Sequence, residues 1–287
     1  MVLYTNREES ISMLSSNNWR TYNYGVFPNI APDLEISEST EEIKSLINIR
    51  KRNFYARWTT NFDCENETSF WYIIKDYFDG FNELSANTRS KVRRGLKKCI
   101  VRKITLEELK ESGYSVYQSA YLGYSKSSSY LDEGKFKEGV NNLSSDYELW
   151  GVFFQETNKL VAYSQNRLYS KSCEYRVIKL NPDYLKYYTS YALIFKMNEH
   201  YLLERKLKYV NDGARNISHQ TNIQDFLEQK FKFRKAYCKL HVEYVFALKI
   251  ILFFLTFTRP ILNFLPAKYS AIINTLLVQE EIRSSFE

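Results

Sequence analysis

The sequence predicts a mixed α/β fold: a largely antiparallel sheet flanked by helices on both faces, with a small N-terminal subdomain and an apolar helical C-terminal tail. Two runs of aromatic and β-branched residues, 149–154 and 160–163, are separated by a short polar turn, as antiparallel strands are. Residues 174–180 alternate in side-chain type with period two, whereas from about Thr189 the apolar spacing becomes helical. The chain then turns strongly apolar over 244–255.

The first 83 residues are expected to form an aromatic-rich subdomain packed against the rest. Their polar start lacks the basic-then-apolar order of a signal peptide, so we expect a cytoplasmic protein. A helix is predicted from Thr40, with apolar residues at helical spacing behind a possible N-cap. Residues 54–58 and 70–74 are dense in aromatic and β-branched residues and are typical of strands. The expected domain bounds are 1–83, 84–240 and 241–287.

Positive charge is most concentrated between residues 84 and 103. Arg89, Arg93 and Lys97 fall four residues apart and would share one face of a helix, while Val92 and Leu96 mark its buried side. Such a face suits the phosphates of a cofactor, a nucleotide sugar, a lipid-linked substrate or tRNA. The alternative is a solvated helix face, which is the usual role of a charge run. A strand is expected directly afterwards, at 100–104.

Residues 105–145 are expected to be helical. Thr105 is followed three residues later by Glu108, the spacing of a capping box, in which each residue's side chain bonds the other's backbone N–H. These helices would lead into the strands at 149–154, 160–163 and 174–180.

The stretch from 174 to 215 is the most informative in the chain, since it runs strand, polar loop, helix and second strand. Asn181-Pro182-Asp183 ends the first strand, and 207–210 forms the second. A helix that starts directly after a strand presents unpaired backbone N–H groups and a positive dipole end, which attract phosphate. Two strands that separate around such a helix leave a slot for an extended ligand. The alternative is an ordinary strand–helix–strand unit with nothing bound.

Three segments carry a resemblance to a known family. They are Leu180-x-Pro182-x-Tyr184-x5-Ser190-x-Ala192-Leu193, the late run 226–234, and Leu84-x4-Arg89-x3-Arg93-Arg94-x2-Lys97. In this order, over residues 84–240, they resemble the GNAT superfamily of N-acyltransferases, in the branch related to the Fem peptidoglycan aminoacyltransferases. The resemblance implies a GNAT-like fold, acyl-CoA (acetyl-CoA above all) as cofactor, and an amine as acceptor.

The same resemblance implies where the cofactor would bind. The oxyanion donor would be a backbone N–H of the strand before the loop, and the loop with the helix start would hold the pyrophosphate. The family's loop glycines fall on Lys186 and Tyr188 here, and Glu228 stands where many relatives carry a tyrosine that protonates the leaving thiolate. The candidate cofactor-binding residues are Ile178, Lys179, Leu180, Lys186, Tyr187, Tyr188, Thr189 and Ser190.

The candidate catalytic residues are Glu174, Asp212 and His219. Acyl transfer to an amine needs a group that takes the ammonium proton, and a carboxylate where the strands separate could do so directly or through water. His219 lies in a polar loop expected nearby, and histidine is the side-chain type whose ordinary pKa is close to neutral pH. The alternatives are a surface strand residue paired with a lysine for Glu174 and a turn former ahead of Gly213 for Asp212.

Composition narrows the classes of function. The formal charge of +7 favours anionic partners, although solubility explains it as well. The four cysteines have no paired spacing, so no metal site is expected, and no Walker loop or esterase elbow occurs.

The apolar run at 244–255 leaves three alternatives open: a helix packed on the domain, an anchor at an anionic membrane surface, or a membrane span.

Two classes of function remain. The first is an N-acyltransferase that modifies an amine, expected to be an amino sugar, free or lipid-linked, in cell-envelope polysaccharide assembly; its variant uses aminoacyl-tRNA as Fem-type enzymes do. The second is a non-catalytic member of the fold that serves as a binding or scaffold protein.

Overall fold

The computed structural model describes residues 18–22, 24–49, 52–122, 130–217, 222–257 and 267–286. The described chain divides into two compact units, and it passes between them more than once. Unit 1 comprises residues 73–213 and 221–234, and unit 2 comprises residues 8–72, 214–220 and 235–287, in each case where described. Strands β4 (Phe70–Lys75), β9 (Tyr209–Ala214) and β10 (Arg234–Tyr244) each run across a boundary between the units.

Unit 1 contains a sheet in the order β9-β8-β7-β6-β5. Its strands are β5 (Cys99–Ile104), β6 (Tyr147–Phe154), β7 (Lys159–Leu168), β8 (Ser172–Leu180) and the described part of β9. The pairs from β5 to β8 are antiparallel, and only β8 with β9 is parallel. This is the mixed, largely antiparallel sheet that the sequence predicts.

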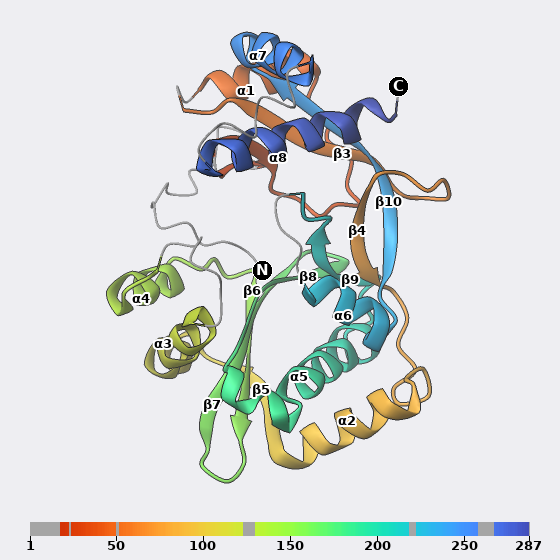
Figure 1. Cartoon of the computed structure of the whole chain (residues 1–287). Helices are drawn as coiled ribbons and strands as arrows, with labels where there is room; N and C mark the ends of the chain where they lie inside the picture. The colour runs from red at the N-terminus through yellow and green to blue at the C-terminus, as the bar shows by residue number, and fades with distance from the viewer. Residues whose placement is uncertain are drawn as a thin grey trace. The chain divides into compact units, whose positions relative to one another are not determined.

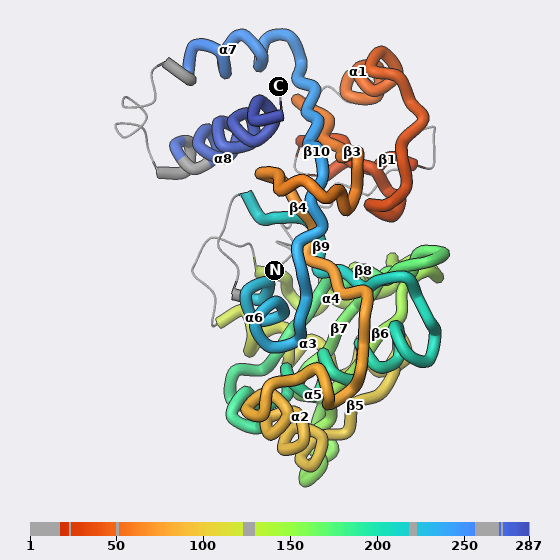
Figure 2. Tube along the Cα trace, turned by 90° about the vertical axis from the view of Figure 1, so that its right-hand side faces the viewer, coloured from red at the N-terminus to blue at the C-terminus, as the bar shows by residue number. Residues whose placement is uncertain are grey.

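Helices cover both faces of this sheet (Figure 1). On one face lie α3 (Leu106–Leu122) and α4 (Glu133–Asn141), which pack on β7 and β8 through an apolar cluster centred on Leu109, Val116 and Tyr163. On the other lie α2 (Ala86–Lys98) and α5 (Thr189–Asn198), which run side by side (Figures 1 and 2). The 3-10 helix η1 (Pro182–Tyr187), the π-helix η2 (Glu199–Glu204) and α6 (Asn222–Phe231) complete the unit.

Unit 2 contains β1 (Trp19–Tyr22), β2 (Gly25–Pro28), β3 (Tyr55–Cys64) and most of β10. Helix α1 (Thr40–Asn48) packs on one face around Trp19 and Ile43, whereas α7 (Phe246–Phe257) and α8 (Ala267–Ser284) pack on the other around Leu240 and Val242. Alternate residues of β10 face the two layers, as the period of a strand requires. No helix within the described ranges has the length and apolarity to cross a bilayer.

Most predicted helices and strands are confirmed. Ser39 caps α1 in a reciprocal capping box with Glu42, and Thr105 does the same with Glu108 through bonds of 3.1 and 2.9 Å. The region expected to be helical from 105 to 145 contains two helices, α3 and α4. The second strand, expected at 207–210, is β9, which continues through Asp212 to Ala214, beyond its last pair with β8 at Asn211. Asp212 is therefore a strand residue and not a turn former. The three domain bounds expected from the sequence stay a prediction.

Candidate active site

Strands β8 and β9 separate after three residue pairs. Their parallel register joins Ser172 to Tyr209, Cys173 to Val210 and Glu174 to Asn211. The register of β8 with β7 continues beyond this point to Leu180. Among the described strands, β8 therefore has a partner on only one side from residue 175 onward. We call the place where the two strands separate the fork.

A β-bulge explains the separation. Opposite β7, Val177 pairs with Gln165 and Tyr175 with Asn166, so Arg176 is an extra residue with no partner in the register. A bulge bends its strand and increases the local twist. It lies two residues after the last pair with β9, so β8 turns away where that pairing ends.

The bulge also changes which side chains face which layer. Before it, Tyr175 points toward α5, where its hydroxyl donates a 2.9 Å bond to Oδ1 of Asn198. After it, Val177 belongs to the apolar cluster under α3. Simple alternation would place both on the same face. The bulge accordingly puts Glu174, Val177 and Lys179 on the α3 side of the sheet.

A tight loop joins β8 to α5. The Asn181 side chain accepts the N–H of Asp183 at 3.0 Å and so starts η1. The loop ends at Tyr188, which adopts a left-handed conformation with φ of 60° and donates its N–H to the Leu185 carbonyl at 2.9 Å. This conformation costs a non-glycine residue roughly 1–2 kcal/mol. Tyr188 thus occupies, with strain, a backbone conformation that glycine adopts freely.

The start of α5 has the features of an anion-binding site. The first α-helical bond runs from the Ala192 N–H to the Tyr188 carbonyl at 3.1 Å, so the N–H groups of residues 189–191 have no acceptor within the helix. The Thr189 hydroxyl is fully buried and has no hydrogen-bond partner in the described part of the chain. Lys186 in the loop before the helix is exposed, and its Nζ lies 5.3 Å from the Tyr187 ring centre. Donor groups are therefore concentrated at this helix start, and a cation lies in the loop that precedes it.

Helix α2 holds the loop in place from the other side. A Cβ atom on Gly95 would lie 2.7 Å from the Tyr188 carbonyl oxygen, so only glycine permits this approach. The Arg94 guanidinium lies over the Tyr188 ring at 4.7 Å, and Lys91 Nζ lies 5.4 Å from the Tyr191 ring centre. Arg89, which was predicted to share a basic face with Arg93 and Lys97, donates a hydrogen bond to the Leu84 carbonyl at 3.2 Å.

Two loop tyrosines pack away from the helix start. The rings of Tyr184 and Tyr187 lie 5.3 and 4.7 Å from the ring of Phe154 on β6. Tyr187 was predicted to contact the cofactor. In the structure its ring packs on Phe154 and so joins the loop to the sheet. Its role in binding stays a prediction.

The open edge of β8 carries the predicted oxyanion donors. Along an antiparallel pair, successive residues direct their N–H groups alternately toward the partner and away from it. Between Ile178 and Leu180, at least one N–H therefore points toward the edge of β8 that no longer pairs with β9. The Lys179 side chain lies on the α3 side, 5.8 Å from the Tyr117 ring, and burial lowers the pKa of its ammonium to about 8.

Two carboxylates flank the fork. Glu174 accepts a 3.0 Å bond from the Tyr169 hydroxyl, and its other oxygen lies 3.8 Å from Nε of Arg176. Asp212 is half-buried on β9, one residue past the partner of Glu174. Burial raises the pKa of Asp212 to about 7, and the charge of Glu174 contributes to the rise. Because Asn211 and not Asp212 is the register partner of Glu174, the two carboxylates lie at the fork on opposite faces of the sheet. His219 lies outside the described residues.

The sequence reasoning missed Gly95, the bulge at Arg176 and the titration of Lys179. A signal existed for the first, because a glycine inside a helix costs about 1 kcal/mol relative to alanine and so indicates a packing requirement. The bulge and the shifted pKa depend on neighbours distant in sequence. Glu228, at the position of the family's tyrosine, is exposed on α6.

The residues of the loop and of the start of α5 fit a coenzyme A group in their chemistry. The helix start offers unclaimed N–H groups and the orphan Thr189 hydroxyl, Lys186 offers a cation, and the left-handed Tyr188 reproduces the glycine conformation. Within the described residues, no group of histidine, cysteine or acidic side chains has the arrangement of a metal site.

Comparison with known proteins gives structural similarity alone. No family model and no curated protein matches the chain. Among solved structures it is similar to FemX, with 11% identity, a TM-score of 0.49 and coverage of 74% of this chain and 70% of that one. It is similar to L-PGS from Bacillus licheniformis, with 10% identity, a TM-score of 0.49 and coverage of 92% and 87%. A GNAT family acetyltransferase from Staphylococcus aureus gives 18% identity, a TM-score of 0.30 and coverage of 38% and 81%. Similarity at this level assigns no activity to the chain.

Proposed function

We propose that unit 1 is an acyltransferase domain that moves an acyl group from acyl-CoA, with acetyl-CoA as the leading donor, to an amine. The observation that carries the proposal is the fork, where β8 leaves β9 after Glu174 and continues with an open edge to Leu180, ahead of the loop and the start of α5. It agrees with the resemblance of residues 84–240 to GNAT and Fem-type enzymes. We further propose that the acceptor is an amino sugar, free or lipid-linked, and that the reaction occurs in the cytoplasm.

Each part of the site has a role in this proposal. The N–H groups of residues 189–191, the Thr189 hydroxyl and Lys186 would hold the pyrophosphate, and the open edge of β8 would bind the extended arm. Coenzyme A would supply the acyl group as an activated thioester. An N–H between Ile178 and Leu180 would donate to the carbonyl oxygen as negative charge develops on it.

Asp212 would take the proton from the acceptor ammonium. A base is most effective when its pKa is near the working pH, and the pKa of Asp212 is about 7. Glu174, held by Tyr169 and Arg176, would add to the raised pKa of Asp212 through its negative charge. Glu228 has no assigned role.

Ligand binding tests the donor. Acetyl-CoA should raise the melting temperature of the full chain, because a ligand that binds only the folded state stabilises it. Lys186→Glu should abolish the rise, whereas Lys135→Glu, the same change on the exposed face of α4, should preserve it. Absence of any rise at millimolar acetyl-CoA would argue for a non-catalytic binding protein.

Release of free thiol from acetyl-CoA in the presence of a panel of amino sugars tests the reaction. Asp212→Asn should lower the rate by at least about a hundredfold, in the range of a lost general base. A wild-type protein that binds acetyl-CoA yet acylates none of the panel would contradict the proposed acceptor class.

Aminoacyl-tRNA is a second candidate donor, favoured by the exposed cations Arg93, Arg94 and Lys97 on α2. A protein that uses it should bind tRNA with an affinity that falls steeply with salt. Triple replacement of these residues by glutamine should reduce that salt dependence. If aminoacyl-tRNA is the donor, acetyl-CoA should not stabilise the wild-type chain.

A further inference from the structure

Helix α7 in unit 2 exposes an unusually apolar face. Phe246, Ile250, Phe253 and Phe254 are 79%, 43%, 62% and 63% exposed. At 100° per residue these four positions share one side of the helix, opposite Leu252, which is buried against β10 and α8. Apart from Lys249, every residue from 246 to 255 is apolar. Folded soluble chains rarely leave such a surface in water, so it indicates a binding face.

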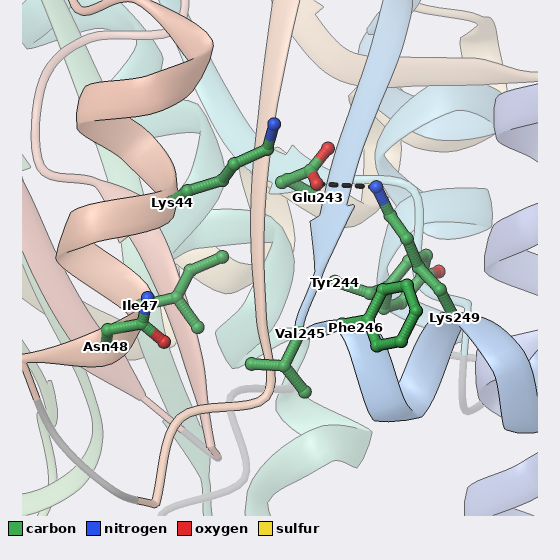
Figure 3. Close-up of a pocket in the computed structure, with 8 residues that line it drawn as sticks. All are labelled: Lys44, Ile47, Asn48, Glu243, Tyr244, Val245, Phe246 and Lys249. Carbon is green, nitrogen blue, oxygen red and sulfur yellow. Dashed lines mark hydrogen bonds and ion pairs between the residues drawn. The ribbon is translucent and has the colours of Figure 1, made fainter.

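A cleft of about 400 Å³ adjoins this face. Its apolar wall is formed by Ile47 of α1 and by Val245 and Phe246, so the cleft and the exposed face of α7 share Phe246. Figure 3 shows Lys44 from α1 and Lys249 from α7 on either side of Glu243.

The cleft carries a net positive charge. Lys249 Nζ bonds Glu243 at 2.6 Å, while Lys44 and Lys249 are both 48% exposed and the Glu243 side chain is only 13% exposed. Lys44 Nζ also lies 4.0 Å from the exposed Glu41 carboxylate. Two lysines with half-exposed side chains thus stand around one largely covered carboxylate in the lining of the cleft. An anionic group would meet both cations at the edge of an apolar surface.

We propose that this part of unit 2 docks on an anionic lipid surface, with the exposed face of α7 in the acyl-chain boundary and a lipid phosphate between Lys44 and Lys249. A helix of 12 residues is too short to span a bilayer and suits one that lies in its surface. Lys249 flanks the apolar face, where a long cationic side chain can reach the headgroups. The combination of largely exposed apolar side chains and adjacent cations favours lipid over a protein partner.

Vesicle flotation of the full chain tests the docking. The protein should float with vesicles of phosphatidylcholine and phosphatidylglycerol and much less with phosphatidylcholine alone. Phe246→Ser combined with Phe253→Ser should weaken binding by about tenfold or more, because two apolar side chains no longer leave water. Leu122→Ser, at a residue 81% exposed in unit 1, is the matched control and should bind as the wild type does.

The charge is tested separately. Lys44→Gln should reduce binding to the anionic vesicles several-fold and weaken its salt dependence, while Lys137→Gln on α4 should leave both unchanged. Equal flotation with both vesicle types, or an unchanged double serine variant, would overturn the proposal. So would a concentration-dependent dimer, measured by light scattering, that the double serine variant abolishes, since a second copy would then cover α7. None of these readouts depends on acyl transfer.

Discussion

The α-helical backbone of Gly95 lies against the carbonyl group of Tyr188, the residue from which α5 starts. A Cβ atom at position 95 would approach that oxygen to 2.7 Å and the Cβ of Ala192 to 3.2 Å. Helix α2 and the loop after β8 are therefore fixed to each other through backbone. Any displacement of α2 moves the groups proposed to bind the cofactor.

Gly95→Ala should accordingly lower the free energy of unfolding by about 1–3 kcal/mol, as overpacking does, and should weaken stabilisation by acetyl-CoA. Gly139→Ala is the matched control, since Gly139 lies in α4 with no atom within 4 Å of an added Cβ. It should raise the free energy of unfolding by about 0.5–1 kcal/mol, through a less flexible unfolded chain. Denaturant titration measures both changes, and equal effects would contradict the contact.

Asp212 should give both activity and stability a pH dependence near neutrality. Because the pKa of its folded form, about 7, is above that of an unfolded aspartate, its contribution to stability is present at low pH and is lost as pH rises through 7. Asp212→Asn should therefore be more stable than the wild type at pH 8, with the difference shrinking toward pH 4. The rate of acyl transfer should rise through pH 7 in the wild type. A variant whose stability advantage grew on acidification would show that burial does not raise this pKa.

Lys179 should give stability a pH dependence opposite in sign to that of Asp212. Burial lowers the pKa of its ammonium to about 8, so the folded state favours the neutral amine, and stability is lost as pH falls through 8. Lys179→Met should stabilise the protein at pH 7 by up to about 3 kcal/mol, because the pKa of the ammonium falls from 10.5 to about 8 on folding. The gain should diminish as pH rises toward 10.5. Lys159→Met, at an exposed position on β7, provides the comparison and should have little effect at either pH.

The pair Lys75–Glu83 should be important for stability of unit 1. Its atoms are 2.8 Å apart, and the side chains are only 2% and 5% exposed. Glu83→Gln should cost about 3–5 kcal/mol, because it leaves a buried ammonium without its counter-charge. Glu156→Gln breaks a 2.7 Å pair with Lys98 whose side chains are 61% and 48% exposed, and it should cost less than about 1 kcal/mol. Comparable losses in the two variants, measured by denaturant titration, would contradict the difference in burial.

Local signals in the sequence identified most of the secondary structure. The capping pair Thr105 and Glu108, the strand alternation at 149–154 and the stop at Asn181-Pro182 act through residues only a few positions apart. Such short-range rules hold wherever the element is later placed. They also located the loop and helix start at 181–190 and the basic helix before it.

Tertiary structure decided what these elements do together. The bulge at Arg176 depends on the register against β7, and it reverses the faces that alternation assigns to β8. The pKa values of Asp212 and Lys179 depend on desolvation by segments far away in the chain. The sequence by itself determined which residues could carry charge and where helices start; packing between distant segments decided which of those charges are buried, because desolvation is a property of the assembled neighbours.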